Sequence, residues 1–353
     1  MTKEEAFEVA NKYVASKNPT EELLEKTVDK LYDFYKKEGY PNYNKSKYDI
    51  NKLCDKIRNV NEAEYYDGQR KLLKKNPTFN GFLFSYFPHW INVKCGTDKT
   101  SLAERWEDER QLKSLLRKTL IWLPKHNEKW SDNRIRQNAK VFCAGQTVSN
   151  FNPVSAKYLY NYYGNNGTVL DMSSGWGGRL FGFLGSNCTK YIGYEPSSAT
   201  YDGLKNLEHD ISKYIKANNL EKEIVLYRKG SEEIRVPDES VDFCFTSPPY
   251  FDTEQYSDEK TQSYIKFNTR ESWSNDFLGE TFRRCYKALK NNCYMAINIR
   301  NTSKHDWLES ACIEQAMIAG FEYEDTIYYE ISSSSKSSNK EEPVFIFKKK
   351  VRK

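Results

Sequence analysis

Four consecutive residues have the chemistry to hold a flat ring that carries an amine: Ser247, Pro248, Pro249 and Tyr250. They follow residues 241–246, an apolar run that is typical of a buried strand. Each proline fixes its own φ and lacks an amide donor, so the chain must leave the sheet here as a stiff turn. A ring can stack on Tyr250 while its N–H groups donate to the Ser247 hydroxyl and the Pro248 carbonyl. The alternative is a proline turn that only closes a strand.

A glycine-rich turn lies upstream, between a β-prone run at 168–171 and an apolar helix start at 179–184. Its glycines let the backbone turn tightly and let a ligand approach without a Cβ in the way. A second predicted strand, 190–194, is followed by Glu195, which lies 20 residues after Gly175. That is about the spacing at which an acid binds ribose hydroxyls in nucleotide-binding α/β folds. Because such sheets bind ligands at the carboxyl ends of their strands, we expect Glu195 and both turns to share one edge.

These motifs resemble those of a known family. Residues 171–177 resemble the first, AdoMet-binding motif of the DNA amino-methyltransferases. Residues 247–250 resemble the catalytic motif of the same family, in which Asp, Asn or Ser precedes two prolines and an aromatic residue. The likeness is closest to phage- and plasmid-type site-specific DNA methylases, and it covers about residues 150–350.

The resemblance implies a role for individual residues. It makes the turn after the later strand catalytic: Ser247, Pro248, Pro249 and Tyr250. It implies a set of cofactor-binding residues: Phe151, Asp171, Ser173, Gly175, Trp176, Gly177, Glu195, Ser231 and Glu232. Many members carry Pro and Phe after the first-motif acid, whereas this chain has Met172 and Ser173 there. We therefore expect Trp176 or Phe151 to supply the ring contact with the cofactor, and Ser231 and Glu232 to lie near its adenine.

The implied reaction is methyl transfer from S-adenosyl-L-methionine (AdoMet) to an exocyclic amine of a DNA base, by direct attack and without a covalent enzyme intermediate. In a duplex the target base must be flipped out, and Tyr250 would stack on it. Serine before the two prolines is commoner among cytosine-N4 enzymes than adenine-N6 enzymes, but both bases stay open. Cytosine-C5 methylation is excluded, because in that family the thiolate nucleophile follows a proline, and no proline here precedes a cysteine.

Two other functions stay open. The same fold can act on RNA or on a glutamine side chain, although glutamine methylases normally carry Asn where Ser247 stands. A non-catalytic nucleic-acid-binding subunit can also retain the fold, although both motifs look intact here. The recognition sequence, the oligomeric state and the existence of a restriction partner, which would make this a restriction–modification methylase, stay open.

The composition agrees with a nucleic-acid partner without requiring one. The chain has 353 residues, a formal net charge of +5 and 15% aromatic residues, which suit base stacking and phosphate contact.

No apolar run is long enough for a membrane span. The eight cysteines form no Cys-x-x-Cys pair and there are only four histidines, so we expect no metal site. Scattered cysteines favour a reducing compartment, which we take to be the cytoplasm of a bacterial or phage-infected host cell.

Strand and helix patterns alternate from residue 168 onward, which predicts an α/β fold with a mainly parallel, Rossmann-like sheet of the AdoMet-dependent methyltransferase type. The chain is expected to divide into a mostly helical N-terminal region, 1–149, which binds DNA or buttresses the sheet, and a catalytic domain, 150–353. Four helical segments are expected on periodicity: 2–15, 20–37, 47–75 and 101–121. A further helix is expected at 272–289, and an antiparallel closing pair of strands at 326–331 and 344–347.

Overall fold

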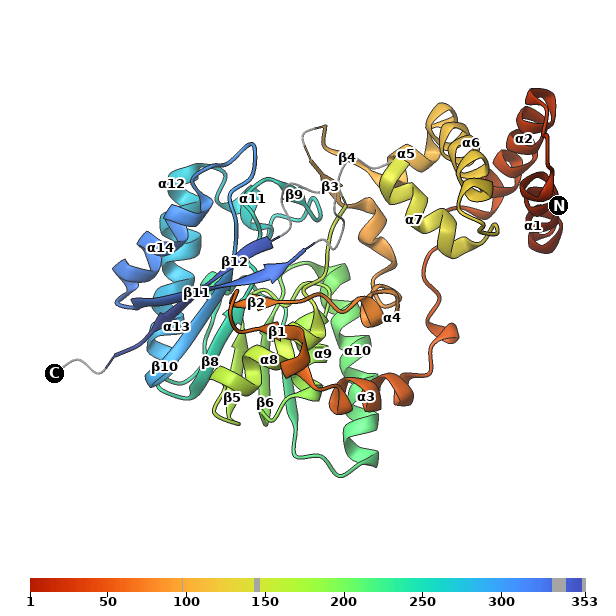
Figure 1. Ribbon diagram of the computed structural model, residues 1–353. Coiled ribbons are helices and arrows are strands. Elements are labelled where there is room, and N and C mark those ends of the chain that lie inside the picture. The colour runs from red at the N-terminus through yellow and green to blue at the C-terminus, as the bar shows by residue number, and fades with distance from the viewer. Residues whose placement is uncertain (97, 143–146, 332–340, 351–353) are drawn as a thin grey trace. The chain divides into compact units, whose positions relative to one another are not determined.

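The computed structural model describes residues 1–96, 98–142, 147–331 and 341–350 (Figure 1). The chain forms two compact units built from interleaved segments. Unit 1 comprises Met1–Tyr43, Pro88–Val148 and Glu254–Tyr256, and unit 2 comprises Asn44–Phe87, Ser149–Thr253 and Ser257–Lys353. The division into regions 1–149 and 150–353 with separate functions stays a prediction.

Unit 1 is mostly helical. Its helices are α1 Lys3–Ala15, α2 Glu21–Glu38, α5 Leu102–Glu107, α6 Glu109–Lys125 and α7 Asp132–Phe142. The first two confirm the predicted helices, because the Thr2 and Thr20 side chains accept hydrogen bonds from the amides that open them. The apolar side of α6 is buried and packs among α1, α2 and α7.

The single helix expected at 101–121 was wrong, since two helices occupy that stretch. Ser101 and Glu104 form the expected capping box, but α5 ends at Glu107. Asp108 then adopts an extended conformation, with ψ of 115°, and its carboxylate accepts from the Gln111 amide to cap α6. An N-cap residue in the middle of a periodic pattern therefore starts a new helix.

A small antiparallel sheet completes unit 1. Strand β3 Lys94–Cys95 pairs with β4 Thr100–Ser101 on one side and with β9 Glu254–Gln255 on the other. Strand β9 follows Tyr250 by only a few residues, so the segment after the predicted catalytic turn continues directly into unit 1.

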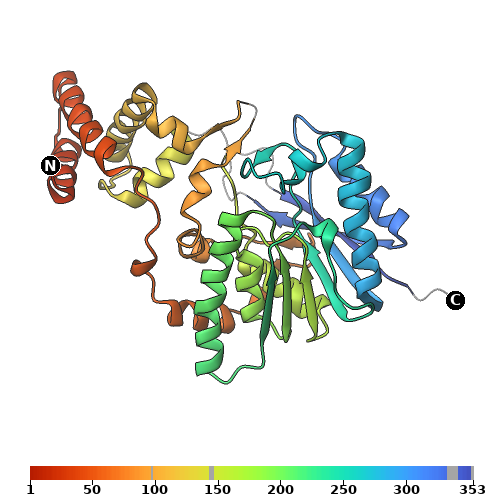
Figure 2. The same ribbon diagram turned by 180° about the vertical axis from the view of Figure 1, so that it is seen from behind.

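Unit 2 is built on a large, mainly parallel sheet (Figures 1 and 2). Its strands are β1 Tyr66–Asp67, β2 Leu72–Leu73, β5 Thr168–Asp171, β6 Lys190–Tyr194, β7 Glu223–Tyr227, β8 Val241–Thr246, β10 Leu289–Asn298, β11 Glu322–Glu330 and β12 Glu341–Lys348. The described strands lie in the order β1-β2-β11-β12-β10-β8-β5-β6-β7. β12 runs antiparallel between β10 and β11, whereas β10, β8, β5, β6 and β7 are parallel. This arrangement confirms the predicted α/β fold with a mainly parallel sheet and an antiparallel closing pair.

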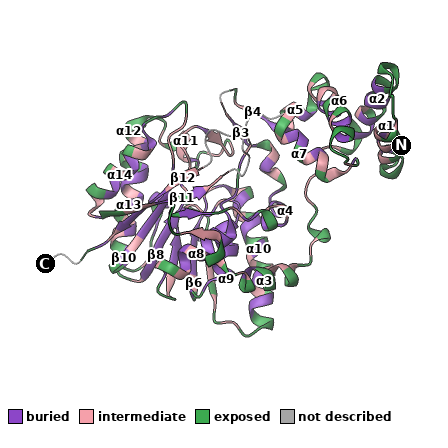
Figure 3. Cartoon of the chain, in the orientation of Figure 1, coloured by how far each residue is buried: buried purple, intermediate pink, exposed green. Residues whose placement is uncertain are grey.

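Helices cover both faces of this sheet. They are α3 Ile50–Asn59, α4 Asn80–Phe84, α8 Pro153–Tyr163, α9 Gly178–Gly185, α10 Ser198–Ala217, α11 Ser263–Lys266, α12 Arg270–Ser272, α13 Glu280–Ala288 and α14 Leu308–Ala319. On one face Tyr160 of α8 contacts Phe243 and Phe245 of β8 edge-on. On the other face the buried side chains of α13 and α14 join Leu170 and Cys244 in one core. The central strands are therefore buried on both faces (Figure 3).

Two further helix expectations need correction. The helical pattern expected over 47–75 holds only for α3, after which the chain forms the short strands β1 and β2 that extend the sheet edge. The helix expected at 272–289 contains a π-helical turn, Trp273–Gly279, ahead of α13. Its buried Trp273 and Phe277 belong to the core beneath the predicted catalytic turn. π-helical turns are rare and often accompany functional sites.

Across the part of the chain that the structure describes, no helix is both long and apolar enough to cross a membrane.

Candidate functional site

The strand order reverses beside β5. Strands β6 and β7 continue on one side of β5, while the next strand along the chain, β8, lies on its other side. Outside the carboxyl ends of two such strands lies the crevice where open α/β sheets bind ligands. The glycine-rich turn follows β5 and the Ser247–Tyr250 turn follows β8. The structure thus brings both predicted motifs to the same edge at the point where the order reverses.

The four residues of the turn after β8 differ in how far they are buried. Pro248 is buried, whereas Ser247, Pro249 and Tyr250 are half-buried. Among the described residues, the Ser247 hydroxyl has no hydrogen-bond partner, so it is available to a ligand. The Tyr250 hydroxyl lies 3.5 Å from Glu342 Oε2 of β12, and Arg300 Nε lies 2.7 Å from the other oxygen of that carboxylate. Burial raises the pKa of Glu342, and the Arg300 guanidinium opposes this shift.

The residue after the motif has an uncommon backbone conformation. Phe251 has φ of +52°, in the left-handed region that a non-glycine residue rarely adopts. Its ring lies edge-on to Trp273, His305 and Trp307, with centroid distances of 5.2 to 5.9 Å. His305 Nε2 lies 2.5 Å from Asp252 Oδ1, which ties the loop after β10 to the turn. This aromatic support was not predicted, because its members are far apart in the sequence.

The glycine-rich turn needs its glycines for two different reasons. Gly175 has φ of +53°, and a Cβ built there would meet no atom closer than 3.8 Å. Gly177 has φ of +74°, and a Cβ there would lie 2.6 Å from a methyl group of Leu207. Gly175 therefore provides a backbone conformation with open space beside it, whereas Gly177 allows α10 to pack closely against the start of α9.

Asp171 lies beneath the turn and is almost fully buried. Its Oδ2 accepts hydrogen bonds from Arg179 Nε at 2.8 Å and from the Tyr191 hydroxyl at 2.7 Å. Its Oδ1 accepts from the Thr246 hydroxyl at 3.1 Å and from the Ser173 amide at 3.2 Å. Both oxygens are thus occupied by protein donors from the turn, α9, β6 and β8.

Arg179 is the main residue that the sequence prediction missed at this site. Its side chain is buried, pairs with Asp171 and also donates to the Ser173 carbonyl. A signal was present in the sequence: Arg179 directly follows two glycines at the start of an otherwise apolar helix. A lone cation on a buried helix requires a buried acceptor, and the acid at the end of the preceding strand is the nearest one along the chain.

Glu195 follows β6 and is buried beside the same turn. Its two carboxylate oxygens accept from the Gly175 amide at 3.1 Å and the Ser197 amide at 3.0 Å. Burial raises the pKa of Glu195 to about 7, and the two backbone hydrogen bonds oppose that rise. A buried carboxylate with only two amide donors retains capacity to accept hydroxyl donors.

The two candidate aromatic residues both pack against protein rings. Phe151 stacks on Tyr329 at a centroid distance of 4.5 Å and lies edge-on to Phe245. Trp176 contacts Phe84 and Phe87 at 5.9 and 5.6 Å. Both are buried next to the turn, so any contact with a cofactor uses the remaining edge or face of each ring.

Ser231 and Glu232 follow β7 and are buried. The Ser231 hydroxyl lies 2.8 Å from that of Thr281 on α13. Glu232 pairs with Lys266 of α11 at 2.6 Å, which connects the β7 turn to the segment after the Ser247–Tyr250 motif. Their side chains are thus already engaged by other residues of unit 2.

The C-terminal part of the chain is similar to a known protein family. Residues 241–353, which begin at β8 and include the Ser247–Tyr250 turn, match a family model for N6/N4 methyltransferases described as DNA methylase. These residues are therefore similar to the DNA methylase domain that the model describes, and this likeness implies S-adenosyl-L-methionine as methyl donor.

The solved structures that resemble the chain include AdoMet-dependent methyltransferases. A TehB-like methyltransferase from Corynebacterium glutamicum is 16% identical, with 64% of this chain and 100% of that chain covered and a TM-score of 0.37. The 1,6-didemethyltoxoflavin N1-methyltransferase of Burkholderia thailandensis is 11% identical, covering 56% and 76%, with a TM-score of 0.38. A methyltransferase from Methanosarcina mazei is 10% identical, covering 52% and 93%, with a TM-score of 0.35. No curated protein matches the chain.

The residues of unit 2 fit AdoMet on two counts. The Glu195 carboxylate retains acceptor capacity for a ribose diol at the carboxyl end of β6. The open space at Gly175 leaves room for a ligand against the backbone of the turn. In the described ranges, no group of His, Cys, Asp and Glu side chains is placed to hold a metal ion.

Proposed function

We propose that the protein transfers a methyl group from AdoMet to an exocyclic amine of a DNA base, as a site-specific N4-cytosine or N6-adenine methyltransferase. The observation that carries this proposal is the position of the two turns. The Ser247–Tyr250 turn and the glycine-rich turn follow adjacent parallel strands at the point where the strand order reverses. A cofactor held at one turn and a base held at the other would therefore lie side by side.

The turn after β8 would hold the target amine. The Ser247 hydroxyl and the Pro248 carbonyl would accept its two N–H bonds, which favours a pyramidal nitrogen with a free lone pair. Tyr250 would stack on the ring of a base flipped out of the duplex. Serine is no general base at neutral pH, so the amine would lose its proton after the transfer. Positioning and electrostatics would then supply most of the acceleration, without a covalent enzyme intermediate.

The glycine-rich turn would hold the cofactor, and bound AdoMet would supply an electrophilic methyl group. Glu195 would accept hydrogen bonds from the ribose hydroxyls, with Gly175 and Gly177 shaping the turn. The buried Asp171 would act on the cofactor through the turn that it holds, because its oxygens already have four donors. Ser173, Phe151, Trp176, Ser231 and Glu232 would complete the site around it.

A direct assay tests the proposal. The protein is incubated with AdoMet labelled at the methyl group and with duplex DNA of mixed sequence, and the DNA is digested to nucleosides. Label in N4-methylcytosine or N6-methyladenine supports the proposal and decides the base. Label confined to RNA or protein in parallel incubations would contradict it.

A control variant separates catalysis from cofactor binding. Ser247→Ala removes the free hydroxyl and leaves the buried core unchanged. Transfer should fall by about 100- to 1000-fold, the range for loss of one positioned hydrogen-bonding group, while AdoMet affinity stays constant. If the unmodified chain has no affinity for AdoMet, it is instead a non-catalytic nucleic-acid-binding subunit that keeps the fold.

A further inference from the structure

Positive charge is concentrated in one segment of unit 1. Residues 88–148 contain twelve Lys and Arg against seven Asp and Glu, whereas residues 1–43 contain seven against nine. The chain's net charge of +5 is thus equal to that of residues 88–148 alone. A local excess of cations is the electrostatic footprint of a polyanion partner.

Most cations of unit 1 are already engaged by its own residues. On α6, Lys113 pairs with Asp29, and Arg117 pairs with Glu21 and Glu25 of α2. On α7, Arg134 pairs with Glu128, and Arg136 donates to the Pro41 carbonyl. A partner would have to compete with these contacts for the same side chains.

One face of α6 differs. Arg110, Ser114 and Lys118 recur at intervals of four residues, so they lie in a row along the helix. Arg110 and Lys118 are exposed, and neither has an ion-pair or hydrogen-bond partner among the residues that the structure describes. The row spans about 12 Å at 1.5 Å per residue.

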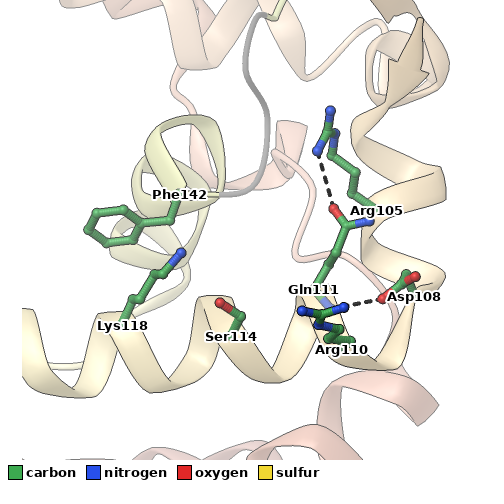
Figure 4. Close-up of a pocket in the computed structure, with 7 residues that line it drawn as sticks. All are labelled: Arg105, Asp108, Arg110, Gln111, Ser114, Lys118 and Phe142. Atoms are coloured by element: carbon green, nitrogen blue, oxygen red, sulfur yellow. Dashed lines mark hydrogen bonds between the residues drawn. The ribbon is translucent and has the colours of Figure 1, made fainter. Parts of the chain in front are cut away.

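This row lines a hollow on unit 1 (Figure 4). Arg105 of α5 and Phe142 at the end of α7 complete its walls, and the hollow encloses about 320 Å³. The Arg105 guanidinium donates to Gln111 at 3.2 Å and pairs with Asp98, so its charge is already compensated and the free cations of the hollow are Arg110 and Lys118. The one acid at the rim, Asp108, uses its carboxylate to cap α6.

We propose that this hollow binds the phosphate backbone of duplex DNA. Arg, Lys, Ser and Gln side chains are the groups that commonly contact DNA phosphates and position the protein without reading sequence. A row of about 12 Å can reach more than one phosphate, because phosphates of one strand follow each other every 3.4 Å along the helix axis. The inference rests on the proposed function, since DNA is the substrate of that reaction.

The test compares the salt dependence of binding in two double variants. Arg110→Gln/Lys118→Gln removes both free cations of the hollow. Lys26→Gln/Lys30→Gln changes the net charge equally, but it removes two exposed cations of α2 that do not line the hollow. Binding of a fluorescently labelled duplex is followed by anisotropy over a range of NaCl concentrations, with methyl transfer to the same duplex measured separately.

The Arg110→Gln/Lys118→Gln variant should bind about tenfold or more weakly at moderate salt. Its slope of log K against log salt should shrink by about 0.9 for each phosphate that the variant no longer neutralises. The α2 variant and the charge-conserving Arg110→Lys/Lys118→Arg variant should keep the slope of the original chain, and all variants should keep their melting temperature and AdoMet affinity. Equal slopes in the two Gln double variants would overturn the inference, as would polyglutamate competing as well as duplex DNA at equal charge.

The two proposals fail separately in this experiment. If the chain methylates DNA but the Arg110→Gln/Lys118→Gln variant keeps the original slope, only the phosphate site is refuted. If the slope shrinks in that variant but the chain transfers no methyl group, only the proposed reaction is refuted.

Discussion

The carboxylate of Asp171, at the end of β5, accepts a hydrogen bond from the hydroxyl of Thr246, at the end of β8, over 3.1 Å. Asp171 opens the glycine-rich turn, and Thr246 directly precedes Ser247. One buried contact therefore joins the two turns that we assign to the cofactor and to the target base. Arg179 compensates the charge of this carboxylate from below the turn.

Replacing Thr246 with Val should loosen this connection without changing the shape of the core. The free energy of unfolding should fall by about 1 kcal/mol, the usual contribution of one hydrogen bond. Methyl transfer should fall further than stability alone explains, since Ser247 is the next residue. Chemical denaturation and kcat on duplex DNA measure the two effects. The matched control is Thr168→Val, the same substitution at the first residue of β5, away from both turns. An equal loss of kcat in the two variants would contradict the role of Thr246.

Arg179→Met should be far more destabilising, because it leaves Asp171 buried without its cation. Removing one partner of a buried ion pair typically costs about 3–5 kcal/mol. The double variant Arg179→Met/Asp171→Asn should lose less than the sum of the two single variants, since no unpaired charge remains. Urea denaturation gives the four free energies of this cycle.

Arg283→Met provides the comparison for Arg179, since Arg283 pairs with Glu280 on the surface of α13. That change should cost less than about 1 kcal/mol. Strictly additive losses for Arg179 and Asp171 would mean that the two side chains are not coupled.

The features that sequence predicted well are local. Residues 168–171 and 241–246 are apolar runs that can be buried on both faces, and the glycines and prolines after them can only form turns. The spacing from Gly175 to Glu195 follows from one helix between two strands, so it predicts the contact between their ends. These patterns were sufficient to place both motifs at one edge of the sheet.

The features that sequence missed depend on contacts between distant segments. No pattern near β8 indicates that Thr246 would face Asp171, because that requires the pairing of β5 with β8. Strand β9 is too short to be recognised without its partner β3. The sequence did not reveal the break at Asp108, because an aspartate at this position can either continue a helix or cap a new one. Its extended ψ shows that it caps α6.

Two substitutions at Tyr250 separate its ring from its hydroxyl. Tyr250→Phe should change kcat/KM on duplex DNA by no more than about threefold, because a 3.5 Å contact with Glu342 is at the limit of a hydrogen bond. Tyr250→Ala should lower kcat/KM by about 10- to 100-fold, since stacking of a base on an aromatic ring contributes about 1–3 kcal/mol. AdoMet affinity measured by calorimetry should be unchanged in both. Equal losses in the two variants would show that the hydroxyl, and not stacking, carries the role.

The raised pKa of Glu195 gives cofactor binding a specific pH dependence. Burial raises this pKa from 4.5 to about 7, so the folded chain holds the proton more tightly than the unfolded chain between those values. The contribution of this proton to the free energy of unfolding is fully present below pH 4.5 and is lost as the pH rises through 7.

AdoMet binding should show the opposite trend with pH, because ribose hydroxyls donate to the ionised carboxylate. If only that form binds, the association constant should fall by about tenfold between pH 8 and pH 6. Glu195→Gln should bind more weakly at pH 8 and should lose most of this dependence, while any titration of AdoMet itself remains in both proteins. Calorimetric titration at several pH values measures the difference. Parallel curves for the two proteins would remove Glu195 from the cofactor site.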